Sequence, residues 1–170
     1  MSATDPTSPT AGALRRLESW PRWRLASLPT PLRTAGRLAG HLGVPHAYVK
    51  MDAETGFALG GNKVRKLELE LAPHRLEGVT HLITAGGPQS NHCRVTAAAA
   101  ARLGLGCVLV VQGPEPPRPT GNALLQRLFG AEIHTVARRE DRDPGMEEVA
   151  AGLRAEGAEP LVVPIGASTG

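Results

Sequence analysis

The chain has 170 residues, which is enough for one compact domain with a buried core. Its hydrophobic share of 41% argues against wholesale disorder. Its formal charge of +3 comes from scattered arginines, which disfavours nucleic-acid binding and suits a small anionic ligand. Cys93 and Cys107 lack CxxC spacing and the histidines lack metal-ligand spacing, so we expect no disulfide framework, no metal site and a reducing, cytoplasmic location. No segment approaches the length of an apolar membrane span.

The N-terminal part shows no regular alternation of strands and helices. Residues 1–24 are predicted to comprise a disordered leader over Met1–Ala13, rich in Ser, Thr, Pro and Ala, and a short helix over Leu14–Trp20. The segment Leu28–Leu32 (LPTPL) is expected to be extended because each proline restricts the residue before it. The next predicted elements are a helix ending at Gly43, a strand over His46–Lys50 and a loop over Met51–Gly61.

From residue 62 onward, helices and strands alternate. The predicted helices are Asn62–Leu76, Ser90–Leu103, Gly121–Phe129 and Pro144–Glu156, and the predicted strands are His81–Ala85, Cys107–Val111, Glu132–Val136 and Leu161–Pro164. The strands are apolar on both faces, which is typical of a parallel sheet covered by helices. The pattern therefore predicts an α/β fold with three layers, a parallel sheet and helices on both of its faces.

The first segment suited to chemistry is Gly60–Leu67 (GGNKVRKL). Two glycines precede Lys63 at the start of a predicted helix and allow the backbone to approach a bound group closely. Arg65 and Lys66 lie within one turn and disfavour a third positive charge, which favours attack of the Lys63 amine on a carbonyl group. The helix N-terminus and Lys66 are together suited to holding a phosphate. Taken alone, a lysine in such a place is most often a solvated helix residue.

The second segment is Gly86–His92 (GGPQSNH), which follows a predicted strand and opens the next helix. Open α/β sheets bind their ligands at the carboxyl ends of the strands. Ser90 and Asn91 are typical N-cap residues, and a helix start with free N–H groups also binds a carboxylate, so the two roles are compatible. The residues predicted to grip a substrate carboxylate are Gln89, Ser90, Asn91 and His92.

Two common phosphate-binding motifs are excluded. Asn62 separates the glycine pair from Lys63, and Val64 stands where a phosphate loop requires Ser or Thr. The segment Gly104–Gly106 follows a helix and enters a strand, which is the reverse of a dinucleotide fingerprint.

Four acids and one cysteine near these segments are expected to have structural roles. Asp52 and Glu54 are predicted to be turn residues or groups that orient the glycine loop. Glu68 and Glu70 are expected on the helix surface, and Cys93 is expected to be a packed thiol.

Four motifs, in order, carry a resemblance to a known family: LPTPL at 28–32, YVKMD at 48–52, Gly60–Leu67 and Ala85–Arg94. Together they resemble the D-cysteine desulfhydrase and 1-aminocyclopropane-1-carboxylate (ACC) deaminase family over residues 25–170. This resemblance implies the tryptophan synthase β-like fold (fold type II) and the cofactor pyridoxal 5'-phosphate (PLP). It implies a lyase or deaminase that converts a small amino acid to a 2-oxo acid and ammonia, and a homodimer for the full-length enzyme.

The resemblance also assigns roles to residues. Lys63 matches the catalytic lysine that attaches to PLP and later moves a proton, and Lys66 matches a residue near the cofactor phosphate. Asn91 matches the asparagine that holds the ring hydroxyl of the cofactor. Ser90 matches the catalytic serine beside the substrate.

Gln89 belongs to the same carboxylate-binding loop, and His92 resembles the desulfhydrase side of the family more than the deaminase side. The sequence departs from the family pattern at three places. Met51 and Ala53–Glu54 replace an arginine and a second acid, and Pro88 stands where a less rigid residue is common.

Family members are about twice as long as this chain, which resembles their N-terminal half. Residues 25–65 are predicted to be a strip of the large PLP domain, 66–163 the small α/β domain and 164–170 the start of the return into the large domain. Exposed edges and apolar surface are expected where the rest of that domain would dock. The alternatives are another fold type II activity (sulfo-lyase, racemase or β-replacement), a non-catalytic α/β binding module, and an incomplete enzyme that does not retain PLP.

Overall fold

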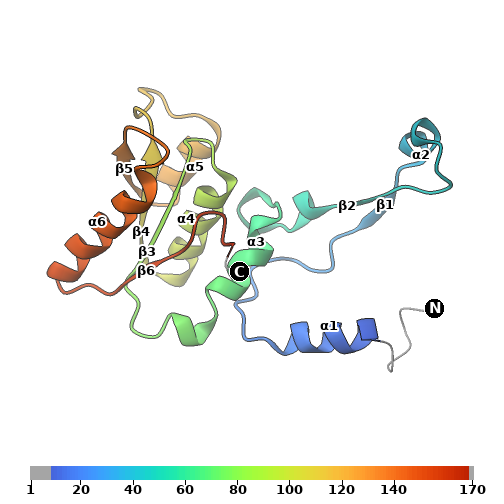
Figure 1. Ribbon diagram of the computed structural model, residues 1–170, viewed down its shortest axis with the longest axis horizontal. Helices are drawn as coiled ribbons and strands as arrows, with labels where there is room; N and C mark the ends of the chain where they lie inside the picture. Colours follow the sequence, from blue (N-terminus) through green and yellow to red (C-terminus); the bar gives the residue numbers. More distant parts are fainter. Residues whose placement is uncertain (1–8, 169–170) are drawn as a thin grey trace.

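The computed structural model describes residues 9–168 (Figure 1). Its α-helices are α1 (Pro9–Ser19), α2 (Gly36–Leu42), α3 (Lys63–Glu70), α4 (Asn91–Leu103), α5 (Gly121–Leu128) and α6 (Arg142–Ala155). Its strands are β1 (Leu32–Thr34), β2 (Tyr48–Lys50), β3 (His81–Gly86), β4 (Gly106–Gln112), β5 (Glu132–Val136) and β6 (Pro160–Val162). Three single 3-10 turns occur at Asp52–Glu54, Phe57–Leu59 and Pro73–Arg75.

The central element is a four-stranded sheet in the order β5-β4-β3-β6, in which every pairing is parallel. Helix α4 covers one face, with α3 and α5 packed against it, and α6 covers the other face, as Figure 1 shows. The predicted α/β fold, with a parallel sheet and helices on both faces, is therefore confirmed. The order matters for function because β3 and β6 are neighbours, so the loops that follow them lie next to each other.

Successive residues of the central strands feed two separate cores. Leu82 of β3 and Leu109 of β4 pack with α3 and α4, whereas Ile83 and Val110 pack with Met146 of α6. Because side chains alternate between the faces of a strand, a strand buried on both faces is apolar at every position. This explains why the sequence of these strands is continuously hydrophobic.

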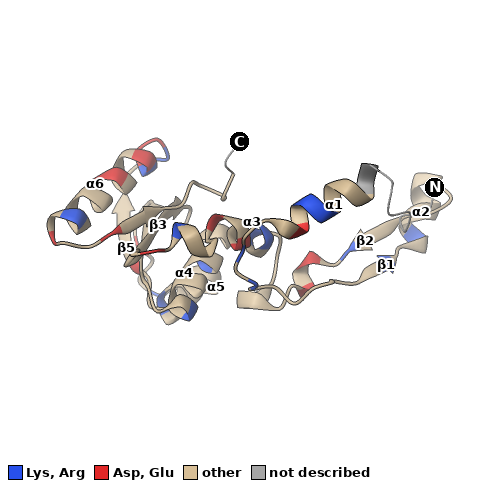
Figure 2. Cartoon of the chain, turned by 90° about the horizontal axis from the view of Figure 1, so that it is seen from below, with Lys and Arg blue, Asp and Glu red and all other residues tan. Residues whose placement is uncertain are grey.

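The N-terminal part forms an arm that projects from this α/β body (Figure 1). Strands β1 and β2 pair antiparallel in a short ribbon, and α2 lies at its far end. LPTPL contains a cis Leu28–Pro29 peptide bond and leads into β1. The arm exposes apolar side chains, as expected of surface that a further part of the fold would cover: Leu32, Leu38, Leu42, Val44, Tyr48 and Val49. Figure 2 shows Lys and Arg on several helices along the chain, including α1, α3, α5 and α6.

Two helix boundaries differ from the predictions by more than two residues. Helix α1 begins at Pro9, so the last residues of the predicted leader are helical. The helix contains Ala, Leu and Arg, which are good helix formers. Residues 1–8 of that leader lie outside the described residues. Helix α3 ends at Glu70, six residues before the predicted end, because Ala72 precedes Pro73 and adopts an extended conformation (φ −54°, ψ 143°).

The predicted surface positions of Glu68 and Glu70 are wrong. Glu68 is 3% exposed, and its carboxylate accepts hydrogen bonds from the backbone N–H groups of Leu25 and Ala26 at 2.7 and 2.8 Å. Glu70 is 6% exposed and forms an ion pair with Arg75. Both acids are buried because the N-terminal segment and the turn after α3 fold over this helix.

Within residues 9–168, no helix is long and apolar enough to cross a membrane. Over the same part of the chain, His, Cys, Asp and Glu form no group of three that is suited to a metal ion.

Candidate active site

Lys63 begins α3, and the loop before it is tightly packed. Gly60 has a φ of +74°, and a Cβ atom at this position would lie 1.9 Å from the carbonyl oxygen of Ala53. The N–H of Gly61 donates to the carbonyl of Asp52 at 2.8 Å. Gly60 is therefore required for packing within the loop itself, a reason that differs from the predicted close approach to a ligand.

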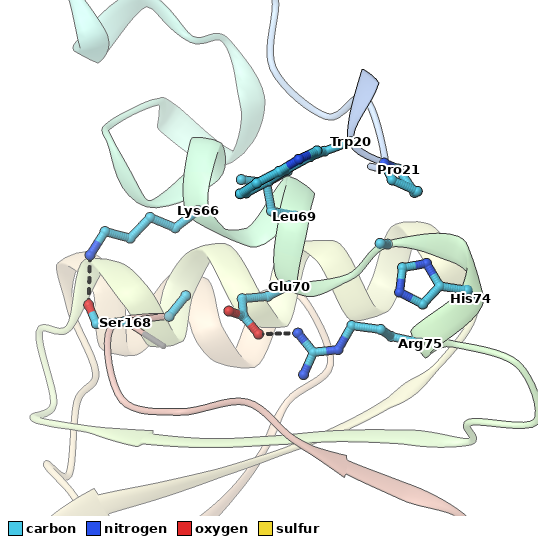
Figure 3. Close-up of a pocket in the computed structure, with 10 residues that line it drawn as sticks. Trp20, Pro21, Lys66, Leu69, Glu70, His74, Arg75 and Ser168 are labelled. Carbon is cyan, nitrogen blue, oxygen red and sulfur yellow. Dashed lines mark hydrogen bonds and ion pairs between the residues drawn. The ribbon is translucent and has the colours of Figure 1, made fainter. Parts of the chain in front are cut away.

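The cations that follow Lys63 have separate partners. Arg65 donates to the Asp52 carboxylate, with NH2 to Oδ1 at 2.8 Å, and this hydrogen bond is the main cause that holds the pKa of Asp52 below its usual range. Asp52 thus fixes the glycine loop and balances the charge of Arg65. The predicted crowding of Lys63 by Arg65 is weakened by this pairing. Lys66 donates to Ser168 Oγ at 2.7 Å (Figure 3).

The turn after β3 leads directly into α4. Ser90 is the N-cap, and its Oγ accepts a hydrogen bond from the N–H of Cys93 at 3.2 Å, as predicted. A Cβ atom at Gly86 would lie 2.7 Å from both Cys93 Sγ and Ser90 Oγ, so a glycine is needed where the strand meets the helix. The N–H groups of Asn91 and His92 have no hydrogen-bond partner within residues 9–168. Such free groups at a helix start attract an anion.

Lys63 and this turn line the same open groove, which has a volume of about 660 Å³. A Cβ atom at Gly166, in the loop after β6, would lie 3.6 Å from Lys63 Nζ, so the amine rests beside that loop. Because β3 and β6 are neighbours in the sheet, the turn after β3 and the loop after β6 lie side by side. The predicted residues on the groove are Lys63, Gln89, Ser90, Asn91 and His92.

Lys66 lines a different cavity, of about 550 Å³, which Figure 3 shows together with Trp20 and Ser168. The ion pair of Glu70 and Arg75 lies on the same cavity. Lys63 and Lys66 thus line two separate cavities, and both amines lie beside the loop that follows β6, near Gly166 and Ser168 respectively.

His92 lies beneath the groove and is 3% exposed. Its Nε2 is 2.9 Å from Thr84 Oγ1, and that hydroxyl donates to the carbonyl of Val163 at 2.8 Å. The hydroxyl hydrogen is thus in use, so His92 Nε2 carries the hydrogen that it shares with Thr84, and Nδ1 is an acceptor without a partner among the described residues. Burial first, and the charge of Lys63 second, lower the pKa of His92 to about 4. His92 is therefore neutral at physiological pH.

The side chain of Gln89 is engaged with the start of α5. Its Nε2 donates to the carbonyl of Thr120 at 3.0 Å, and its Oε1 accepts from the N–H of Asn122 at 2.8 Å. Both ends of the amide thus tie the turn before α4 to the start of α5, so the side chain of Gln89 is already engaged.

Three polar residues of the site were not predicted from the sequence. Arg94 of α4 and Asn122 of α5 are bonded to Asn91, and Arg142 of α6 lines the groove. The one available signal was the spacing of Arg94, three residues after Asn91 and so on the same face of a helix otherwise rich in alanine.

Both cysteines are buried thiols, as predicted for Cys93. Burial raises the pKa of Cys93 to about 11 and that of Cys107 to about 12, so neither provides a thiolate at neutral pH.

The chain is similar to known proteins over most of its length. Residues 24–169 match the family described as pyridoxal-phosphate dependent enzyme. D-cysteine desulfhydrases of Klebsiella pneumoniae subsp. pneumoniae and Salmonella paratyphi B are each 42% identical over 161 residues, which cover 92% of this chain and 49% of theirs. The chain thus spans about half the length of these curated relatives.

Solved structures lead to the same family. The crystal structure of an ACC deaminase homologue superposes with a TM-score of 0.82 at 36% identity, over 96% of this chain and 49% of that one. A pyridoxal 5'-phosphate-dependent aspartate racemase, at 21% identity and a TM-score of 0.62 over 79% of this chain and 40% of that one, shares the fold. The match over residues 24–169 and the desulfhydrase and deaminase relatives show that this chain belongs to the pyridoxal-phosphate dependent enzyme family.

Proposed function

We propose that this chain supplies the lysine side of a PLP site in an enzyme of the D-cysteine desulfhydrase and ACC deaminase type, which converts a small amino acid to a 2-oxo acid and ammonia. The observation that carries the proposal is the meeting of Lys63 with the N-terminus of α4 in one groove. An amine and an anion-binding helix start are the two features that a PLP enzyme needs at the reacting end of its substrate.

The residues on the groove fit the cofactor chemically. Lys63 provides the only amine on the groove among the residues that line it. The Oδ1 atom of Asn91 accepts hydrogen bonds from Arg94 and Asn122, so its Nδ2 remains as a donor suited to the ring hydroxyl of PLP. When bound, PLP supplies an electron sink for the bond that breaks at the substrate α-carbon.

The protein contributes binding, orientation and proton transfer. The free N–H groups of Asn91 and His92 would hold the substrate carboxylate at the positive end of α4. Lys63 Nζ would hold the cofactor covalently and, once released, take and return a proton at the α-carbon. Ser90 Oγ accepts from the N–H of Cys93 and keeps its own hydrogen free to donate toward the substrate.

Lysine labelling tests the cofactor role directly. The chain has three lysines, Lys50, Lys63 and Lys66, so each is an internal control for the others. The protein is incubated with PLP, reduced with borohydride and mapped by peptide mass spectrometry. We expect selective labelling of Lys63, loss of that label in Lys63→Arg, and retention in Lys50→Arg. Equal labelling of the three lysines, or an undiminished total label in Lys63→Arg, would contradict the proposal.

Competition tests the substrate class. A substrate amine that displaces Lys63 protects it from reductive labelling. We expect D-cysteine to protect Lys63 at lower concentration than L-cysteine does, and both enantiomers react equally with free PLP, so their difference reports the protein alone. Equal protection by the two enantiomers would refute the D-amino acid assignment, and stronger protection by ACC would move it to the deaminase side.

A further inference from the structure

Arg94 is a buried cation that the proposed chemistry does not use. It lies in the first turns of α4 and is 7% exposed, in a helix whose other buried residues are mostly small. A buried guanidinium group is costly unless its N–H groups are hydrogen-bonded. Its partners therefore indicate what this arginine holds in place.

The guanidinium group joins three segments that are distant in sequence. NH2 donates to the carbonyl of Gly60 in the loop before Lys63 at 2.7 Å. NH1 donates to Oδ1 of Asn91 and to Oδ1 of Asn122, each at 3.0 Å. One side chain thus connects the lysine loop, the start of α4 and the start of α5.

The same contacts determine which way the amide of Asn91 faces. Its Oδ1 accepts from Arg94 NH1 and from Asn122 Nδ2, the latter at 2.9 Å, so both lone pairs of that oxygen are used. Asn122 Nδ2 also donates to the carbonyl of Gln89 at 2.8 Å, which fixes the turn on its other side. The donor end of the Asn91 amide is left for the groove.

We propose that Arg94, assisted by Asn122, is a positioning residue that sets the lysine loop and the donor direction of Asn91 relative to each other. The purpose of this arrangement rests on the proposed function, whereas the contacts themselves do not depend on it. The planar fork of a guanidinium group is needed because its two terminal nitrogens reach Gly60 and the two amides at the same time. A lysine at this position provides a single nitrogen and cannot bridge the same separation.

Two variants test separately the link of Arg94 to the lysine loop and the orientation of the Asn91 amide. Arg94→Lys removes the link to Gly60 and the fixed contact with Asn91. Asn122→Ala keeps the bond between Arg94 and Gly60 but removes one donor from Asn91, together with an acceptor for Arg94 NH1 and the donor to the carbonyl of Gln89. The control is Arg102→Lys, which changes an exposed arginine near the end of the same helix.

The readouts are amide hydrogen exchange and side-chain amide NMR. The N–H groups of Gly60 and Gly61 are hydrogen-bonded to Phe57 and Asp52, so their exchange reports the loop. We expect Arg94→Lys to accelerate their exchange at least about tenfold and to shift the Asn91 side-chain resonances. We expect Asn122→Ala to shift the Asn91 resonances with loop exchange unchanged, and Arg102→Lys to change neither.

The outcomes decide the inference whether or not the chain binds PLP. Unchanged loop exchange in Arg94→Lys, unchanged Asn91 resonances in Asn122→Ala, or an equal acceleration of exchange over all helices would overturn it, the last because it indicates a merely structural role. Labelling of Lys63 by PLP is measured in the same variants. If the unmodified chain is not labelled at Lys63, the proposed function fails, and the exchange and NMR results still decide the role of Arg94.

Discussion

The buried His92 predicts a specific loss of stability in mild acid. Its pKa is about 4 in the folded chain against an ordinary value of 6.5, so between these values the unfolded state binds the proton more readily. The contribution is fully present above pH 6.5 and falls as the pH falls toward 4. The whole interval corresponds to about 3 kcal/mol, and about 2 kcal/mol of it is lost between pH 7 and pH 5.

The structure supplies the physical reason for this value. Protonation would place a charge on a ring that is 3% exposed and close to the positive charges of Lys63 and Lys66. A backbone hydrogen bond with Pro164 and, more weakly, the charge of Glu70 act in the opposite direction. Desolvation and the charge of Lys63 outweigh both, so the pKa of His92 is lowered.

The assay is urea unfolding at pH 7 and pH 5 for the wild type and for His92→Gln, whose amide retains a donor for Thr84. Other groups titrate in both proteins, so the comparison of the two pH-dependent losses isolates His92. We expect the wild type to lose about 2 kcal/mol more than the variant over this range. Equal losses, or an NMR titration of the His92 ring near pH 6.5, would refute the reasoning.

Three further perturbations follow from named contacts. Glu68→Ala removes the acceptor for two backbone N–H groups and should cost about 2–4 kcal/mol in urea unfolding, whereas the exposed Glu77→Ala should change stability by less than about 0.5 kcal/mol. Gly86→Ala should cost about 1–3 kcal/mol and reduce PLP labelling, since its Cβ atom has no room; unaltered stability would contradict this. Arg65 lowers the pKa of Asp52, so this pair stabilises the fold above about pH 4 and loses its effect as the pH falls through the folded pKa; Asp52→Asn should flatten the acid limb of a stability profile.

The parallel sheet could be predicted from the sequence because its signal is local. Strands that are buried on both faces are mostly apolar, and β4 (Gly106–Gln112) contains the predicted run Cys107–Val111, in which every residue is buried. The N-cap at Ser90 could be predicted in the same way, because its Oγ and the Cys93 N–H that donates to it lie only three residues apart. Lys63 and the turn before α4 could each be predicted as a separate motif. Their proximity could not be predicted, because it depends on the pairing of β3 with β6, which places the loop beside Lys63 next to that turn.

What could not be predicted depends on partners that are distant in sequence. Glu68 is a charged residue on a helix, which normally indicates surface, and its burial arises from the N–H groups of Leu25 and Ala26 more than forty residues earlier. Gln89 was predicted to bind the substrate, whereas its side-chain amide donates to the carbonyl of Thr120, the N-cap of α5, thirty-one residues later. Polar residues that hold a site together resemble solvated ones until the fold supplies their partners.

Helix α4 carries Asn91, His92 and Arg94 in its first turns, and most of its remaining buried residues are alanines such as Ala97, which is fully buried. Because the alanine side chain is a single methyl group, the helix packs closely against the sheet and leaves no space for a larger residue. The small residues act as spacers of fixed thickness, so an enlargement deep in the body would tilt the whole helix. The N-terminus of α4, which lines the groove, would then shift relative to Lys63 Nζ, although the change itself lies far from both.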